Sequence, residues 1–323
     1  MNASTAIAVA DVTYHYGQRR ALDNLSLSIA QGEIFAFVGP NGGGKTTLFR
    51  LLTTLMPLQE GSITIDSFDL ASQVDRIRPL LGIVFQSPSL DKKLTVVENL
   101  EHHGHLHGLS GRLLSERVTE SLTRLGIESR RKDLVEKLSG GLRRRVELAK
   151  CMLHRPRILL LDEPSTALDP VARSEMWDYL ESIRKSDGVT VALTTHLLEE
   201  AEKADRLAIL HEGKLVALDT PDALRGTIGG DAITIRTADP ADLAASISAQ
   251  LDCHAEVIDG SVRLQQQEGH RWIAKLVESF PGKIDSITFS RPTLEDVFVA
   301  RTGHRFREDL STDESLERET SHA

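Results

Sequence analysis

Short, continuously apolar runs recur along the first 225 residues of the chain, and each is long enough for one β-strand. Strands that are apolar on both faces are typical of a parallel sheet covered by helices. Between these runs lie segments with helical spacing of apolar residues, such as 45–56 and 171–184. The alternation predicts an α/β fold with a largely parallel central sheet. The predicted central strands are 34–38, 82–85, 158–161, 189–194 and 207–210.

Two parts of this region depart from the simple alternation. Three more strand-like runs, at 8–13, 25–29 and 62–66, have an antiparallel character, and we expect them to form a side sheet beside the mixed central core. Residues 95–153 contain one helical pattern after another and no strand signal. The simplest interpretation is a helical insertion in the α/β core.

After residues 221–230, which are rich in turn formers, a second pattern begins. Its β-α-β-β-α-β order predicts a small α+β domain of the split βαβ type. We therefore expect an α/β domain at 1–230, the small domain at 231–303 and a polar, disordered tail at 304–323. The predicted elements are strand 232–237, helix 240–251, a hairpin of 255–258 and 262–266 around Asp259 and Gly260, helix 269–280 and strand 283–289.

Composition and charge exclude several classes of protein. The 323 residues suffice for about two domains. With 38 Lys and Arg against 47 Asp and Glu, the net charge is −9, which argues against a general nucleic-acid binder. The longest apolar runs fall far short of the ~18 residues of a membrane helix, and the N-terminus does not resemble a signal peptide. Two distant cysteines, Cys151 and Cys253, fit a reducing cytosol.

The strongest chemical signal is the glycine-rich segment GPNGGGKTT between an apolar run and a helical pattern. This strand–loop–helix context is typical of a phosphate-binding loop, in which glycines let successive backbone N–H groups point inward. The following helix N-terminus adds partial positive charge. We expect Lys45 to reach the β- and γ-phosphates and the Thr46 hydroxyl to coordinate Mg²⁺. The candidate loop residues are Gly39, Pro40, Asn41, Gly42, Gly43, Gly44, Lys45, Thr46 and Thr47.

A second signal is RILLLDEP at 157–164, where four apolar residues lead to two adjacent carboxylates. Ligands of open α/β sheets bind at the carboxyl ends of the strands. Asp162 is therefore a candidate for the magnesium shell. Glu163 is a candidate to orient the attacking water or accept its proton.

With these two motifs, the chain resembles the ATPase subunits of ATP-binding cassette (ABC) transporters over residues 7–225. Five further segments match that family in order. They are YHYG with Tyr16, GIVFQ with Gln86, LSGG with Ser139, Gly140 and Gly141, STALD with Asp169, and TTH with His196.

The resemblance implies a role for each of these residues. Tyr16 would stack on adenine, with Tyr14 as a weaker choice, and Gln86 would touch Mg²⁺ or water. His196 would contact the γ-phosphate. The LSGG signature and Asp169 would complete the site of the opposite subunit, so ATP and Mg²⁺ would be held in a homodimer or in a pair of related cassettes.

Each short motif also has an ordinary structural interpretation. Ser139 begins an apparent helix and is a good N-cap in any protein, and a histidine such as His196 at a strand end is often structural. Tyr16 can be a plain strand-end aromatic. The signature also departs from the commoner LSGGQ because Leu142 replaces the glutamine, so no role of that glutamine transfers.

Two other clusters of side chains stand out. The segment EHHGHLHG contains His102, His103, His105 and His107, for which we favour a structural or surface role over metal binding. The basic run 143–145 follows the signature, and we expect it to lie on a helix face or contact a partner.

Two longer stretches narrow the subclass. Residues 86–100 and 291–303, the latter containing LEDVF, resemble the daunorubicin-resistance type of exporter ATPase. This resemblance implies an ATP hydrolase that energises a separate integral-membrane permease from the cytoplasmic side, as a peripheral protein on the inner face of the membrane. An ABC importer, a lipoprotein-release ATPase and a non-transport ABC ATPase remain alternatives, and no nucleic-acid partner is expected.

Overall fold

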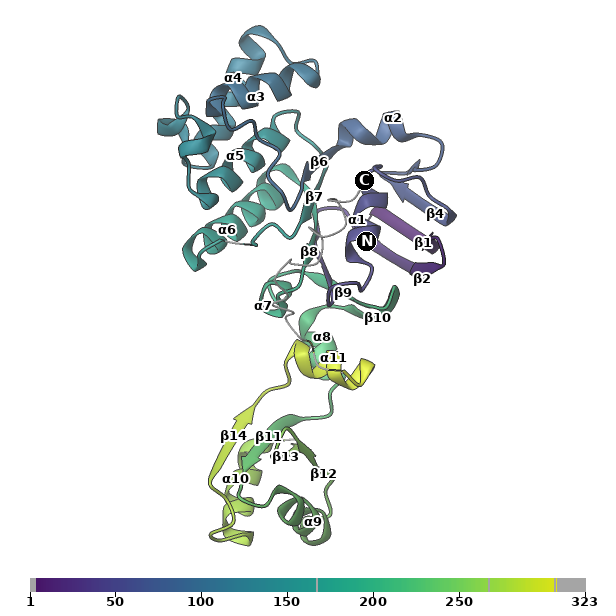
Figure 1. Ribbon diagram of the computed structural model, residues 1–323, viewed down its shortest axis with the longest axis vertical. Helices are drawn as coiled ribbons and strands as arrows, with labels where there is room; N and C mark the ends of the chain where they lie inside the picture. The colour runs from purple at the N-terminus through teal and green to yellow at the C-terminus, as the bar shows by residue number, and fades with distance from the viewer. Residues whose placement is uncertain (1–3, 167, 267, 305, 307–323) are drawn as a thin grey trace, which may run out of the picture. The chain divides into compact units, whose positions relative to one another are not determined.

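The computed structural model describes residues 4–304 and 306, except residues 167 and 267. The chain divides into two compact units. The first ends at Leu218 and the second spans Asp219–Phe306 (Figure 1). Among the described residues, no helix combines the length and the apolar character needed to cross a membrane.

The first unit contains two sheets and a set of helices. Its strands are β1 (Thr5–Tyr16), β2 (Arg19–Ala30), β3 (Ile34–Val38), β4 (Glu60–Ile65), β5 (Phe68–Asp69), β6 (Leu81–Val84), β7 (Ile158–Asp162), β8 (Thr190–Thr195), β9 (Arg206–His211) and β10 (Lys214–Asp219). Its helices are α1 (Lys45–Leu52), α2 (Val74–Ile77), α3 (Val96–Leu106), α4 (Gly111–Arg124), α5 (Gly140–Met152), α6 (Pro170–Asp187) and α7 (Leu198–Ala201), with 3₁₀ turns at Arg78–Leu80, Glu128–Arg130 and Val135–Lys137.

The central sheet has the strand order β10-β9-β3-β8-β7-β6. β3 pairs in parallel with β8 and β9, and β7 pairs in parallel with β6 and β8. Every residue of β3 and of β8 is buried, because helices and the second sheet cover both faces. The predicted parallel α/β core is therefore confirmed.

The side sheet has the order β2-β1-β4-β5, and its pairs are antiparallel. Apolar residues of β1, β2 and β4 form one continuous core with α1 and with β3, β7, β8 and β9. This core fixes α1 between the two sheets. The predicted antiparallel side sheet is also confirmed.

Helix α1 is shorter than the sequence pattern predicts. It ends at Leu52 instead of residue 56, and Thr54 adopts a left-handed φ of 60°. The hydroxyl of Thr53 donates to the carbonyl of Phe49 at 2.9 Å. Such β-branched, hydroxylated residues favour termination over continuation of a helix.

Residues 95–153 form the expected helical insertion, built mainly from α3, α4 and α5 (Figure 1). Helix α3 begins with a capping box, in which Thr95 and Glu98 satisfy each other's backbone N–H groups. All of these residues are described, and no strand forms among them.

The second unit contains a four-stranded antiparallel sheet of order β12-β13-β11-β14. Its order and its α9 and α10 crossovers are those of a split βαβ unit, as predicted. Asp259 and Gly260 both have positive φ, 48° and 71°, as a two-residue hairpin turn requires. The elements are α8 (Pro221–Gly226), β11 (Asp231–Arg236), α9 (Pro240–Leu251), β12 (Ala255–Ile258), β13 (Ser261–Gln266), α10 (Gly269–Ser279), β14 (Ser286–Ser290) and α11 (Leu294–Thr302).

The ends of this unit differ from the expected boundaries. Helix α8, which we had assigned to the first domain at 1–230, groups with the second unit and packs against α11. Residues 305 and 307–323 lie outside the described residues. Phe306 is described, and its ring packs edge-on against Phe298 with centroids 5.1 Å apart. The predicted tail at 304–323 can therefore be judged only at its start.

Candidate functional site

The glycine-rich loop curls between the end of β3 and the start of α1. Gly42 and Gly44 have φ values of 79° and 104°, which residues with a side chain rarely adopt. A Cβ on Gly39 would lie 2.1 Å from the carbonyl oxygen of Leu210 in β9. Glycine is therefore required both by the backbone conformation and by the neighbouring strand. The loop places the N-terminus of α1 at the surface, where an anion can approach it.

Lys45 lies at the inner side of this loop and is only 5 % exposed. Its Nζ donates to the carbonyls of Gly39 at 2.6 Å and Pro40 at 3.1 Å. Burial lowers the pKa of Lys45, while the nearby carboxylates of Glu163 and Asp162 favour its charged form. The structure thus brings the loop lysine and the two predicted carboxylates into one electrostatic group.

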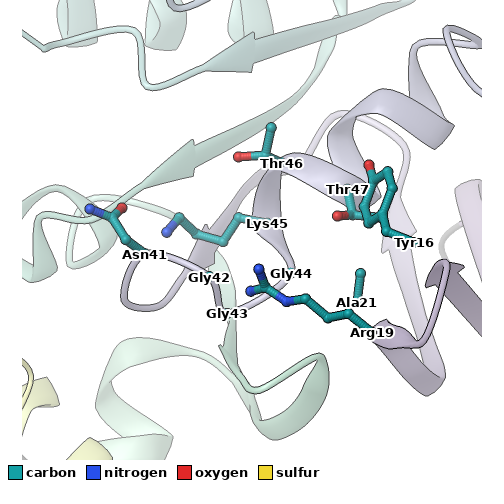
Figure 2. Close-up of a pocket in the computed structure, with 10 residues that line it drawn as sticks. All are labelled: Tyr16, Arg19, Ala21, Asn41, Gly42, Gly43, Gly44, Lys45, Thr46 and Thr47. Carbon is teal, nitrogen blue, oxygen red and sulfur yellow. The ribbon is translucent and has the colours of Figure 1, made fainter. Parts of the chain in front are cut away.

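A cavity of about 140 Å³ opens over the loop. Figure 2 shows Tyr16 and Arg19 on the side-sheet side of this cavity, with the Arg19 side chain reaching toward the glycines of the loop. Tyr16 is 43 % exposed and its hydroxyl contacts Met56 Sδ at 3.2 Å, whereas Tyr14 is buried. The lining residues are Tyr16, Arg19, Ala21, Asn41, Gly42, Gly43, Gly44, Lys45, Thr46 and Thr47.

Arg19 was missed in the sequence analysis. In the structure its guanidinium lies 3.3 Å from the position that a Cβ on Gly42 would take. A cation in this position adds to the positive potential of the loop. The basic pair at 19–20, a few residues after the candidate adenine-stacking tyrosine, was the available signal.

Asp162 ends β7 and is held by Thr194 of the adjacent strand. The Thr194 hydroxyl donates to Asp162 Oδ1 at 2.6 Å and accepts from the backbone N–H of Glu163 at 2.9 Å. Burial raises the pKa of Asp162, and the hydrogen bond from Thr194 opposes that rise. Thr194 was not among the predicted site residues, because only the β7–β8 register brings it beside Asp162.

Three side chains from separate segments converge on the carboxylate of Glu163. Gln86 Nε2 donates to Glu163 Oε2 at 3.1 Å, and the hydroxyl of Thr166 donates to the same oxygen at 3.2 Å. His196 Nδ1 lies 3.3 Å from it. Glu163 itself has a φ of 41°, a conformation that is uncommon outside glycine and is often found at functional sites. The predicted residues Gln86, Glu163 and His196 thus form one cluster.

The signature residues and Asp169 lie outside this cluster in the single chain. Ser139 is the N-cap of α5, and its hydroxyl accepts from the N–H of Leu142 at 3.3 Å. Asp169 caps α6 and accepts from the N–H of Ala172 at 2.9 Å. A Cβ on Gly141 would meet that of Ala172 at 3.1 Å, so the two helix N-termini lie against each other. Both Ser139 and Gly140 are exposed.

Arg144 behaves differently from the helix-face role expected for the basic run 143–145. It is 8 % exposed and donates to the carbonyls of Phe85 and Pro164, both at 2.7 Å. It also donates to the carboxylate of Glu147 at 3.0 Å. Helix α5 therefore holds the segment before Gln86 and the segment after Glu163 together, which the sequence analysis did not foresee.

Comparison with known proteins identifies relatives over most of the chain. Residues 22–166 match the family described as ABC transporter. A daunorubicin resistance ATP-binding protein from Streptomyces coeruleorubidus is 37% identical over 303 residues, which cover 90% of this chain and 92% of that protein. A Nod factor export ATP-binding protein from Rhizobium meliloti (strain 1021) is 35% identical over 308 residues, covering 94% of this chain and 90% of that protein.

A solved structure shares the architecture of the first unit. It is a dimeric ATP-binding cassette in a post-hydrolysis state, bound to ADP and Pi. The cassette is 29% identical, has a TM-score of 0.61, and is aligned over 66% of this chain and 98% of its own.

Proposed function

The chain belongs to the ABC transporter family, as an ATP-binding and ATP-hydrolysing member, and we propose that it powers a separate membrane permease that exports a compound from the cell. The proposal rests on one observation above all. The loop lysine Lys45, the carboxylates of Asp162 and Glu163, and the side chains of Gln86 and His196 lie in one connected site.

ATP is the ligand that this site fits. Its phosphates would lie in the loop from Gly39 to Thr47, where backbone N–H groups, Lys45 and the α1 N-terminus supply positive potential. Arg19 adds a second cation on the side-sheet wall of the cavity. The exposed ring of Tyr16 offers a flat face for adenine. The charge is local, which explains how a chain with a net charge of −9 binds a polyanion.

The donor set near the loop also fits Mg²⁺. Thr46, Gln86 and Asp162 offer hydroxyl, amide and carboxylate oxygens, the hard ligands that this ion prefers. The raised pKa of Asp162 marks a carboxylate with little solvent, where a nearby cation is favourable. When bound, the ion would neutralise charge on the β- and γ-phosphates.

Glu163 and His196 would act on the attacking water. Glu163 would orient it and accept its proton, and the hydrogen bonds from Gln86 and Thr166 hold the carboxylate in position. His196 would donate a hydrogen bond to the γ-phosphate. Positioning and electrostatic stabilisation carry most of the catalysis in phosphoryl transfer.

Two chains would close on two ATP molecules, each site completed by Ser139, Gly140, Gly141 and Asp169 of the opposite chain. The exposure of Ser139 and Gly140 supports this arrangement, because a helix N-terminus at a surface can meet the γ-phosphate of a neighbour. The homodimer would dock on the inner face of the membrane and drive the permease. The drug and Nod factor relatives support export over import.

ATP hydrolysis by the purified chain tests this proposal. Lys45→Ala is expected to abolish turnover through loss of phosphate binding, and Glu163→Gln to lower it by about 10²–10⁴-fold while ATP still binds. Glu199→Gln makes the same change at an exposed position in α7 and should leave turnover unchanged. Near-wild-type hydrolysis in both site variants would refute the assignment. Co-purification of a membrane protein tests the transport role.

A further inference from the structure

Three histidines from two separate segments meet within the helical insertion. His103 lies in the last turn of α3, His107 is the C-cap residue of that helix, and His154 follows α5. One ring nitrogen of each lies within 4.8 Å of the others. The rings of His107 and His154 are stacked, with centroids 3.9 Å apart and an interplanar angle of 10°. This group lies outside the phosphate loop and the Glu163 cluster.

The hydrogen bond of His154 determines which of its nitrogens is free. Its Nε2 lies 3.0 Å from the carbonyl oxygen of Leu81. Because a carbonyl only accepts, Nε2 carries the proton and Nδ1 keeps its lone pair. Nδ1 is buried and has no hydrogen-bond partner, which is costly for a polar atom. A bond from one imidazole nitrogen to a backbone carbonyl is the arrangement that orients metal-binding histidines.

We propose that His103, His107 and His154 bind one divalent transition-metal ion, with Zn²⁺ as the best match. Imidazole nitrogens suit Zn²⁺, and three of them with one open position make a known type of coordination. With Zn–N bonds of about 2.0–2.1 Å, tetrahedral geometry places the nitrogens roughly 3.4 Å apart. The side chain of His107 is exposed, so its rotation can shorten the present separations of the nitrogens, which are up to 4.8 Å, to the separation that a bound ion requires.

The charge state of the cluster suits a metal. Burial lowers the pKa of His103 to about 3 and that of His154 to about 4, so both rings are uncharged at neutral pH. The charge of Lys150 also disfavours protonation of His103. The Nζ of Lys150 donates to the backbone carbonyl of Ser89 at 2.8 Å. The ammonium group is therefore hydrogen-bonded to a residue outside the histidine cluster.

Metal binding at this place would connect the helical insertion to the central sheet. His103 and His107 lie at the C-terminal end of α3, whereas His154 lies between α5 and β7 and is hydrogen-bonded to Leu81, the first residue of β6. The same strand leads to Gln86. The ion would therefore act as a clamp between α3 and the strand that precedes the Gln86 cluster.

Metal binding by the untagged, full-length chain tests the proposal. After removal of metal by a chelator, Zn²⁺ is expected to bind one ion per chain and to raise the unfolding temperature. Co²⁺ is expected to give the visible absorption of a tetrahedral site. His107→Ala should weaken Zn²⁺ binding at least ~10-fold and lower the metal-dependent stabilisation accordingly. The matched control is His105→Ala, which removes an exposed histidine from the same helix and should bind as the wild type does.

A second substitution keeps the result interpretable. His107→Gln retains a polar side chain of similar length. Its metal-free unfolding temperature should match the wild type, while its Zn²⁺ binding should be weakened as in His107→Ala. The proposal is wrong if the metal-free wild type takes up no Zn²⁺ or Co²⁺. It is equally wrong if His107→Ala and His107→Gln bind the ion as tightly as His105→Ala does.

Discussion

Thr194 is a single side chain that contacts both the carboxylate of Asp162 and the backbone of Glu163. Its hydroxyl donates to Asp162 and accepts from the backbone of Glu163, and the residue is 1% exposed. A buried hydroxyl with one donor and one acceptor bond leaves little freedom to either neighbour. Thr194 therefore acts as a positioning residue between the proposed magnesium ligand and the proposed water-activating group.

Replacing this hydroxyl by a methyl group should lower ATP hydrolysis. In Thr194→Val, the carboxylate of Asp162 loses the hydroxyl donor that lowers its pKa. The backbone N–H of Glu163 loses the same hydroxyl as its acceptor. We expect a ~10–100-fold fall in turnover. The pKa of Asp162 should rise further, so the acid limb of the pH–rate profile should move to higher pH. Steady-state assays across pH measure both effects.

Thr194→Ser is the matched variant, since it keeps the hydroxyl and removes only a methyl group. Its turnover and acid limb should remain close to those of the wild type. If Thr194→Val shows an unchanged acid limb, the hydrogen bond does not control the ionisation of Asp162.

At the scale of the element, helix α5 joins the parts of the site through a buried polar face. Arg144, Glu147 and Lys150 recur at a spacing of three residues on this face. Glu147 is 1% exposed and accepts from the N–H of Ser89 at 2.6 Å. Burial lowers the pKa of Arg144 and Lys150, while the carboxylate of Glu147 opposes the shift. The helix thus connects the signature end to the segment that follows Gln86.

Arg144→Leu is expected to destabilise the first unit strongly. The substitution removes the ion pair of the buried Glu147 carboxylate, which then keeps only its hydrogen bonds from Ser89, and removes the donor to the carbonyls of Phe85 and Pro164. Breaking such a buried pair costs about 3–5 kcal/mol. Urea unfolding followed by tryptophan fluorescence measures the loss. The chain has two tryptophans, so Trp272→Phe leaves Trp177 as the reporter of the first unit.

Arg130→Leu is the control for this experiment. Its guanidinium pairs with Asp133 at 3.2 Å on the surface, where its side chain is 57% exposed. Exposed pairs contribute about 0–1 kcal/mol. Equal losses of unfolding free energy in the two variants would show that the buried ion pair of Arg144 stabilises the protein no more than an exposed pair does.

At the scale of the whole molecule, each unit has its own apolar core. The core of the first unit includes residues of both its sheets and α1, whereas the second unit buries Ile233, Leu243, Ile247 and neighbours between its sheet and helices. Helix α8 groups with the second unit and packs on α11, whereas the residues of the second core come from the sheet, α9, α10 and the segments beside them. The unit boundary at Asp219 therefore gives a better point of division than residue 230.

Two truncated chains test this boundary. A chain that ends after Asp219, the last residue of β10, should fold and remain monodisperse. A chain that ends after Gly230 keeps α8 but lacks α11, so Leu224 and Ile228, both buried in the full chain, would be exposed. We expect it to aggregate at lower temperature, as measured by light scattering with Trp177 fluorescence. The opposite order of stability would place α8 in the first unit.

Some features of this protein follow from the order of residues alone. The glycine-rich loop, the carboxylates at the end of β7 and the β-α-β-β-α-β succession of elements in the second unit were predicted because each depends on local geometry. Glycines at fixed spacing determine the backbone conformation of the loop, apolar runs determine which segments form buried strands, and Asp259 with Gly260 forms a hairpin turn. Neighbours in the sequence suffice for these, since backbone conformation is decided over a few residues.

Other features were decided only by the tertiary structure. Thr194 lies 32 residues from Asp162, and Arg144 lies 59 residues from Phe85. His103 and His107 lie far along the chain from His154. Which distant side chains meet depends on strand order, register and helix packing, and no local pattern encodes these. Burial then determines how these neighbouring side chains interact, because a charge or lone pair that is removed from water needs a hydrogen-bond or ionic partner.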